Sequence, residues 1–215
     1  DTMLISQLLQ CPSNKPIMST YPNNYDLDDT NKNYLKTKTI AKLGYDKWDG
    51  KHLSPSGKTV VQGNKPIRGN WIAAGFIFTY MQWNREVKIA RSIMFTGEED
   101  ILFLRSVTNG WEIFCPPESA VYHCYTDTRL QSKKKYRPLV WEDHPDLDTN
   151  MKALHRVVKG ESLGTMKSFE DIERIYGASY ENFTITDWSK RGEVRPFRYV
   201  RKSAPSNVTV PSTRS

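Results

Sequence analysis

The segment that most constrains the fold of this chain is FTGEEDILFLRSVTNGWEIFCPPESAVYHCY. It predicts a helix that starts after Gly97 with Thr96 as its N-cap, because the acidic residues that follow favour the positive end of a helix dipole. The helix is expected to stop at Asn109-Gly110. Strands are then predicted at 111 to 115 and 119 to 125, separated by a stiff Pro-Pro turn. A well-marked helix followed by apolar strands predicts an α/β fold.

Further strands and helices are predicted on both sides of this segment. The run from 71 to 79 is apolar on both faces and holds small residues, as is typical of a central strand that another group approaches closely. The other expected elements are a helix at 1 to 10, strands at 15 to 22 and 37 to 41, a hairpin within 48 to 70, and helices at 148 to 158 and 168 to 176.

The composition is basic, with a formal net charge of +7, which favours an anionic partner. The densest basic runs, at 133 to 137 and 190 to 202, lie outside any nucleic-acid-binding motif, so nucleic acid is disfavoured and a diphosphate satisfies the same charge. No apolar run approaches the about 18 residues of a membrane span. The three cysteines are odd in number and form no Cys-x-x-Cys pair. We therefore expect a cytoplasmic protein with reduced thiols and no membrane partner.

Three carboxylates, Glu98, Glu99 and Asp100, crowd the start of the predicted helix. Simple stabilisation of the helix dipole explains them about as well as a binding function. The functional alternative needs the helix start to lie in a cleft, where Gly97 lets a ligand approach the backbone and the carboxylates accept hydrogen bonds from hydroxyl groups.

A lone histidine, His123, stands among apolar and aromatic residues of the predicted strand at 119 to 125. A core histidine is the commoner explanation, and a metal ligand at a strand end is the functional one. The basic run KKKYR follows. It fits either a solvated surface or a loop that folds over a diphosphate.

Five short motifs, taken in order, resemble the GlcNAc-transferase family that modifies a hydroxyproline of the Skp ubiquitin-ligase adaptor and, more distantly, the polypeptide GalNAc-transferases. The motifs are a Ser-Thr-Tyr-Pro strand, an Ala/Gly-rich strand, a Gly-Glu-Glu helix start, a Thr-x-Gly-x-x-x-x-x-Pro segment and a Val-x-His-x-Tyr strand. In this sequence they are Ser19 to Pro22, Ala73 to Gly75, Gly97 to Glu99, Thr108 to Pro116 and Val121 to Tyr125.

The resemblance implies a GT-A-like fold, in which a mixed sheet is flanked by helices, and a retaining transfer of GlcNAc or a related sugar from a UDP-sugar to a protein or peptide hydroxyl. It implies a divalent cation, Mn2+ or Mg2+, with His123 as a ligand, and Glu98 and Glu99 as catalytic residues near sugar and acceptor. The implied donor-binding residues are Ala74, Gly75, Gly97, Asp100, Arg129, Lys135, Tyr136 and Arg137.

The family's first metal motif, Asp-x-His or Asp-x-Asp, is expected to precede Asp1, so we expect the chain to lack the nucleotide-binding half of the fold. Residues 1 to 145 would then be the C-terminal part of the catalytic domain, 146 to 195 a closing helical segment and 196 to 215 a basic, disordered tail. The alternative function is a non-catalytic carbohydrate- or protein-binding remnant of such an enzyme.

Overall fold

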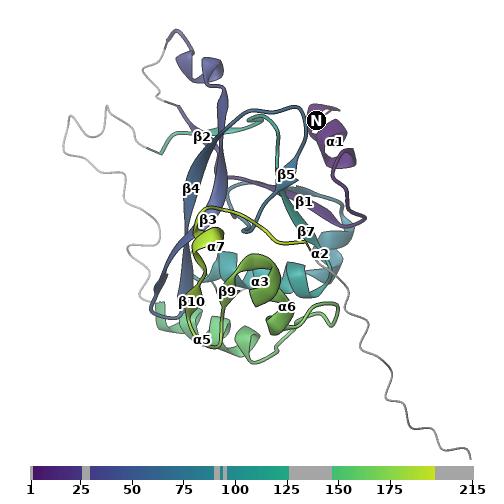
Figure 1. The fold of residues 1–215 in the computed structure, drawn as a ribbon, viewed down its shortest axis with the longest axis vertical. Helices are drawn as coiled ribbons and strands as arrows, with labels where there is room; N and C mark the ends of the chain where they lie inside the picture. The colour runs from purple at the N-terminus through teal and green to yellow at the C-terminus, as the bar shows by residue number, and fades with distance from the viewer. Residues whose placement is uncertain (1, 26–29, 90–92, 94–95, 126–146, 197–215) are drawn as a thin grey trace, which may run out of the picture.

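The fold is a mixed α/β structure, seen in a computed structural model that describes residues 2 to 25, 30 to 89, 93, 96 to 125 and 147 to 196 (Figure 1). Four strands form its main sheet in the order β5-β7-β1-β6. β1 pairs with β7 in parallel and with β6 in antiparallel, and β5 pairs with β7 in antiparallel, so the sheet is mixed. The bounds of these strands are β1 Pro16–Ser19, β5 Ile67–Arg68, β6 Ile77–Thr79 and β7 Glu112–Cys115.

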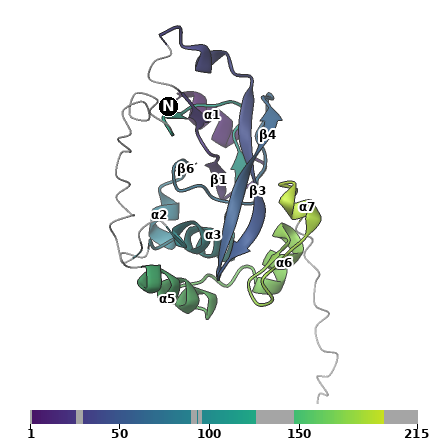
Figure 2. The same cartoon turned by 90° about the vertical axis from the view of Figure 1, so that its left-hand side faces the viewer.

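In the described part of the chain, three pairs of strands lie outside the main sheet. The longest is the antiparallel ribbon of β3 (Thr39–Asp49) and β4 (His52–Val61). Figure 2 shows this ribbon with α3 on one side and α6 and α7 on the other. The shorter pairs are β2 with β8, in parallel, and β9 with β10, in antiparallel: β2 Asn23–Asn24, β8 Tyr122–His123, β9 Ala178–Ser179 and β10 Thr184–Ile185.

Helices cover the sheet and close the fold. They are α1 Thr2–Leu9, the 3-10 helix η1 Asn33–Lys36, α2 Gln82–Glu86, α3 Glu98–Thr108, α5 Leu147–Val158, α6 Phe169–Tyr176 and α7 Asp187–Lys190. The sequence predictions for α1, α3, α5 and α6 are confirmed. The bounds of α6 agree with the predicted range of 168 to 176: Ser168 and Asp171 form a reciprocal capping box at its start, and Gly177 ends it with a positive φ. None of the helices in the described ranges has the length and apolarity that a bilayer span requires.

The core lies between α3, the ribbon and the closing helices. Trp71 packs at 4.9 Å, centroid to centroid, from Phe103 of α3, and Phe103 meets Tyr176 of α6 edge-on at 5.1 Å. Tyr45 of β3 contacts the rings of both Trp71 and Phe103. All four side chains are at most 1% exposed. These aromatic contacts fix α3 against segments that are distant in sequence.

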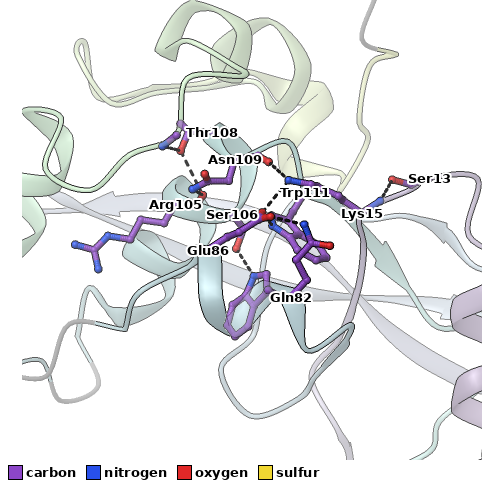
Figure 3. Close-up of polar contacts among 11 residues, drawn as sticks. Ser13, Lys15, Gln82, Glu86, Arg105, Ser106, Thr108, Asn109 and Trp111 are labelled. Atoms are coloured by element: carbon purple, nitrogen blue, oxygen red, sulfur yellow. Dashed lines mark hydrogen bonds and ion pairs between the residues drawn. The ribbon is translucent and has the colours of Figure 1, made fainter.

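Polar contacts hold the C-terminal half of α3 (Figure 3). Glu86 of α2 accepts hydrogen bonds from Lys15 at 2.8 Å and from the Trp111 indole at 2.9 Å. The Lys15 contact lowers the pKa of Glu86. Ser106 of α3 accepts the indole N–H of Trp83 at 2.8 Å. The helix also has a C-cap at Asn109, whose N–H bonds back to the last turn. This end of α3 is therefore secured both locally and by its neighbours.

The structure corrects three strand predictions. Residues 71 to 79 do not form one central strand: only Ile77–Thr79 is strand, at an edge of the described sheet, because Ser19 bonds the backbone of Ala73 and Phe76 and bends the chain there. The strand predicted at 119 to 125 is confined to Tyr122–His123 and pairs with β2. The long β3–β4 ribbon was predicted only as a short strand and a hairpin.

The prediction of Thr96 as the N-cap of α3 is also wrong. Gly97 occupies that position with a φ of 82°, and it has no side chain to cap the helix. A φ in this range favours glycine, which has no Cβ to clash with the following carbonyl. The start of α3 therefore depends on contacts from other parts of the chain.

Candidate functional site

The site begins with the turn that contains Ala74 and Gly75, which are exposed while the residues on both sides of them are buried. Ser19, at the end of β1, accepts the N–H of Ala73 at 2.8 Å and donates its hydroxyl to the carbonyl of Phe76 at 2.9 Å. The turn is closed by the Phe76 N–H, which donates to the carbonyl of Ala73 at 3.2 Å. One buried hydroxyl thus fixes both ends of the turn and leaves its tip open to solvent.

Glu99 holds the same turn from the first turn of α3. Its Oε1 accepts the N–H of Ala74 at 2.9 Å, and its Oε2 accepts the indole N–H of Trp71 at 3.0 Å. Burial raises the pKa of Glu99, and these two hydrogen bonds oppose the rise. Both carboxylate oxygens are engaged with the protein, so the geometry suits Glu99 for positioning the turn.

Glu98 and Gly97 face different surroundings. Glu98 is half-buried, and burial raises the pKa of its carboxyl group. Gly97 is buried, and a Cβ at this position would lie 3.1 Å from Cε of Met151 and 3.6 Å from Cδ2 of Leu154, both on α5. The space beside Gly97 is filled by α5. This contradicts the expectation that Gly97 leaves its backbone open to a ligand.

Asp100 is 1% exposed, and its Oδ1 accepts hydrogen bonds from the Leu53 N–H at 3.1 Å and the Tyr180 hydroxyl at 2.9 Å. A carboxylate in this position has no open side for a sugar or a diphosphate. The structure therefore corrects the expectation that Asp100 contacts a donor directly. Its contacts join α3 to the ribbon and to the closing segment.

His123 lies on β8 and is exposed, so of its two explanations the core histidine is the one that the structure contradicts. Its ring is 4.3 Å, centroid to centroid, from the ring of Tyr125, which follows it by two residues. Within the described ranges no hydrogen bond to the imidazole of His123 is found. The ring therefore has nitrogen atoms available to a ligand.

Tyr125 links the His123 strand to the Ala74–Gly75 turn. Its hydroxyl donates to the carbonyl of Pro22 at 3.1 Å, and its N–H donates to Oδ1 of Asn24 at 3.3 Å. Pro22 in turn lies beside Gly75, because a Cβ added to Gly75 would be 3.9 Å from Cδ of Pro22. Burial raises the pKa of the Tyr125 hydroxyl, and the charge of Glu99 raises this pKa further.

Tyr21 belongs to the same group. Burial raises the pKa of its hydroxyl well above the usual range, and Glu99 and Tyr125 raise it further. Neither tyrosine was predicted as a site residue. Tyr125 had a usable signal, because residues two apart on a strand lie on the same face, so it shares the face of His123. Four predicted site residues, Arg129, Lys135, Tyr136 and Arg137, lie outside the described residues.

The described residues thus bring together the Ala74–Gly75 turn, Glu99 and the strand with His123, through Pro22 and Tyr125. A family model described as "Glycosyltransferase (GlcNAc)" matches residues 1 to 168. A search of curated proteins found no match, and neither did a search of solved structures.

Proposed function

Since this chain belongs to the GlcNAc glycosyltransferase family, we propose that it transfers GlcNAc or a related sugar from a UDP-sugar to a hydroxyl group of a protein or peptide, with retention of configuration. We further propose that the fold is a GT-A variant and that the reaction uses Mn2+ or Mg2+. The observation that supports this best is that the exposed turn at Ala74 and Gly75 is connected, through Pro22 and Tyr125, to the strand that carries the exposed imidazole of His123.

In this reaction the acceptor hydroxyl oxygen forms a bond to the anomeric carbon of the sugar. The bond between that carbon and the β-phosphate oxygen breaks, and the electron pair leaves with UDP. With retention, the acceptor enters on the face from which UDP departs, so the leaving phosphate oxygen takes the proton of the hydroxyl group. The protein has to orient the two groups and offset the charge that develops on the diphosphate.

The residues present fit a metal ion in part. The exposed imidazole of His123 is a suitable nitrogen donor for Mn2+. Within the described ranges no group of three or more His, Cys, Asp or Glu side chains converges to complete a site. In our proposal His123 is one ligand and diphosphate oxygens supply others. A bound divalent cation would neutralise charge on the departing diphosphate.

The other donor contacts are assigned by chemistry. The tip of the turn at Ala74 and Gly75 has no bulky side chain, which lets a sugar ring lie against its backbone. Glu98 is the carboxylate of this helix start that is half-exposed and has no hydrogen bond to the described residues, so we propose it as the group that meets the sugar or acceptor hydroxyls. Arg129, Lys135, Tyr136 and Arg137 remain proposed ligands of the diphosphate.

Isothermal titration of the protein with UDP in the presence of Mn2+ tests this proposal. We expect saturable binding that requires the metal and that His123→Ala weakens at least tenfold. His155→Ala is the matched control, because His155 is also exposed but lies on α5, and it should leave the binding unchanged. Absence of metal-dependent UDP binding, or equal binding by the two variants, would contradict the proposal.

A non-catalytic carbohydrate- or protein-binding function is the second candidate. It is favoured by the incomplete set of metal ligands among the described residues. This candidate predicts binding of GlcNAc-containing ligands without UDP release. A coupled assay for UDP release from UDP-GlcNAc, with a hydroxyl-bearing peptide mixture as acceptor, separates the two functions.

A further inference from the structure

Asp100 is a buried carboxylate that no cation neutralises within the described ranges. The titratable groups that face it are Tyr180, next to β9, Tyr45 of β3, and its neighbour Glu99. Burial raises the pKa of Asp100 to about 7, although the hydrogen bonds from Leu53 and Tyr180 act in the opposite direction. Burying a carboxyl group costs free energy. The proposed transfer gives Asp100 no function, so its position has to be explained by its contacts within the fold.

The contacts of Asp100 set the position of a helix start that lacks a local cap. The N-cap Gly97 has no side chain with which to bond the free N–H groups of the first turn. The first turn is instead anchored by its carboxylates, through Glu99 to the Ala74–Gly75 turn and through Asp100 to the ribbon and Tyr180. A shift at one anchor therefore displaces the other.

The two carboxylates point to different parts of the fold because consecutive residues on an α-helix are about 100° apart around its axis. Glu99 contacts Trp71 and Ala74, which precede it by 28 and 25 residues. Asp100 contacts Tyr180, which follows it by 80 residues. The first turn of α3 thus lies between the donor turn and the closing segment.

We propose that Asp100 and Tyr180 are positioning residues that hold the Ala74–Gly75 turn in place through Glu99. Tyr180 lies beyond residue 168, where the family match ends, so this positioning comes from the closing segment of this chain. The consequence for glycosyl transfer rests on the proposed function, whereas the coupling between Tyr180 and the turn does not.

NMR measurement of hydrogen exchange at the Trp71 indole N–H and the Ala74 amide tests the coupling directly, since Glu99 accepts both protons. Tyr180→Phe removes one of the two donors to Asp100, and we expect exchange at both groups to become about tenfold faster, the effect of one lost hydrogen bond. Amides of β1 and β7 should keep their rates. Tyr176→Phe is the matched control, because the Tyr176 hydroxyl is equally buried and has no hydrogen-bond partner in the described ranges.

The proposal is overturned if Tyr180→Phe leaves both exchange rates at the Tyr176→Phe values, or if it speeds exchange equally in β1 and β7. The second variant, Asp100→Asn, keeps an acceptor oxygen and loses the charge. In the unaltered protein the Trp71 indole signal should shift with a midpoint near pH 7 as Asp100 titrates. That step should be absent in Asp100→Asn, and its midpoint should rise in Tyr180→Phe because the hydrogen bond that lowers the pKa is lost.

UDP titration of the same samples separates this proposal from the proposed function. If the unaltered protein binds UDP, Tyr180→Phe should bind UDP-GlcNAc more weakly and Tyr176→Phe should not, because the proposed contact of the turn is with the sugar. If the unaltered protein binds no UDP but the exchange results hold, the proposed function fails and the positioning pair stands. If UDP binds and the exchange rates do not respond to Tyr180→Phe, the positioning pair fails alone.

Discussion

Trp71 donates its indole N–H to Oε2 of Glu99 at 3.0 Å, and this contact places a carboxylate of the α3 start directly against the core. The ring of Trp71 is 1% exposed and packs on Phe103 of the same helix. The carboxylate therefore meets a donor that has no access to water. An N–H group in that position is costly to leave without an acceptor.

Glu99→Gln is expected to destabilise the protein by about 1 to 3 kcal/mol, because a glutamine has one acceptor oxygen for the two donors Trp71 and Ala74 and leaves one of them unsatisfied. Urea unfolding at pH 7 measures the change. The neighbouring Glu98→Gln is the control, since Glu98 makes no hydrogen bond to the described residues, and its change should stay within about 0.5 kcal/mol. Equal destabilisation by the two variants would contradict the assigned contacts.

Gly97→Ala should destabilise the protein by at least about 1 to 2 kcal/mol, because an alanine is strained at a φ of 82° and its Cβ would lie 3.1 Å from Cε of Met151. Thermal unfolding measures this effect. UDP affinity, measured at a temperature where the variant is folded, should change little, because Gly97 faces α5. A stable variant with selectively lost UDP affinity would restore the sequence-based assignment of Gly97 as a donor contact.

Local sequence signals predicted the longer helices α1, α3, α5 and α6 but not the shorter α2 and α7, and for the candidate site they indicated residues but not their contacts. The capping residues of α6 and the Asn109-Gly110 stop of α3 are adjacent to the elements they bound, so a short window contains them. The ribbon had one such signal, Asp49-Gly50, where Gly50 has a φ of 60° in a two-residue loop. The length of β4 was not predicted, because Pro55 and Gly57 lie within it and these residue types are more typical of a connection than of a strand.

The contacts of the carboxylates could not be predicted from local sequence. Glu99 and Asp100 are consecutive, yet one bonds a turn 25 residues earlier and the other a hydroxyl 80 residues later. Helix-dipole reasoning treats both as equivalent solvent-facing charges. What distinguishes them is the packing of the ribbon and the closing segment around the helix start, which is a property of the tertiary fold.

Asp100→Asn should flatten the dependence of stability on pH. The folded pKa of about 7 lies above the ordinary 3.8, so the folded state keeps a proton that the unfolded chain releases. The stability contributed by this proton is complete below about pH 3.8 and is lost as pH rises through 7, by on the order of 4 kcal/mol. The pKa values of Glu98 and Glu99 are also raised in the folded state, and the pKa of Glu112 is lowered. Because both proteins contain these three residues, their effects cancel in the comparison.

Urea unfolding of both proteins at pH 5 and pH 8 measures this difference. The unaltered protein should lose stability relative to Asp100→Asn between the two values, because only its residue 100 ionises. A difference between the two proteins that is the same at both pH values would show that Asp100 does not titrate in this range.

Gly75→Ala tests whether a ligand lies against the open turn. Among the described residues, a Cβ at Gly75 would meet only Cδ of Pro22, at 3.9 Å, which is an ordinary contact, and the backbone there has no positive φ. The fold should therefore tolerate the change, with a melting temperature close to that of the unaltered protein.

If the donor sugar packs on this backbone, the methyl group added by Gly75→Ala should weaken UDP-GlcNAc binding by about tenfold or more. UDP binding should weaken less, because UDP lacks the GlcNAc ring. Gly63→Ala is the matched control, because no atom of the residues that the structure describes lies within 4 Å of the added Cβ. If Gly75→Ala and Gly63→Ala bind UDP-GlcNAc equally well, the sugar does not lie on this turn.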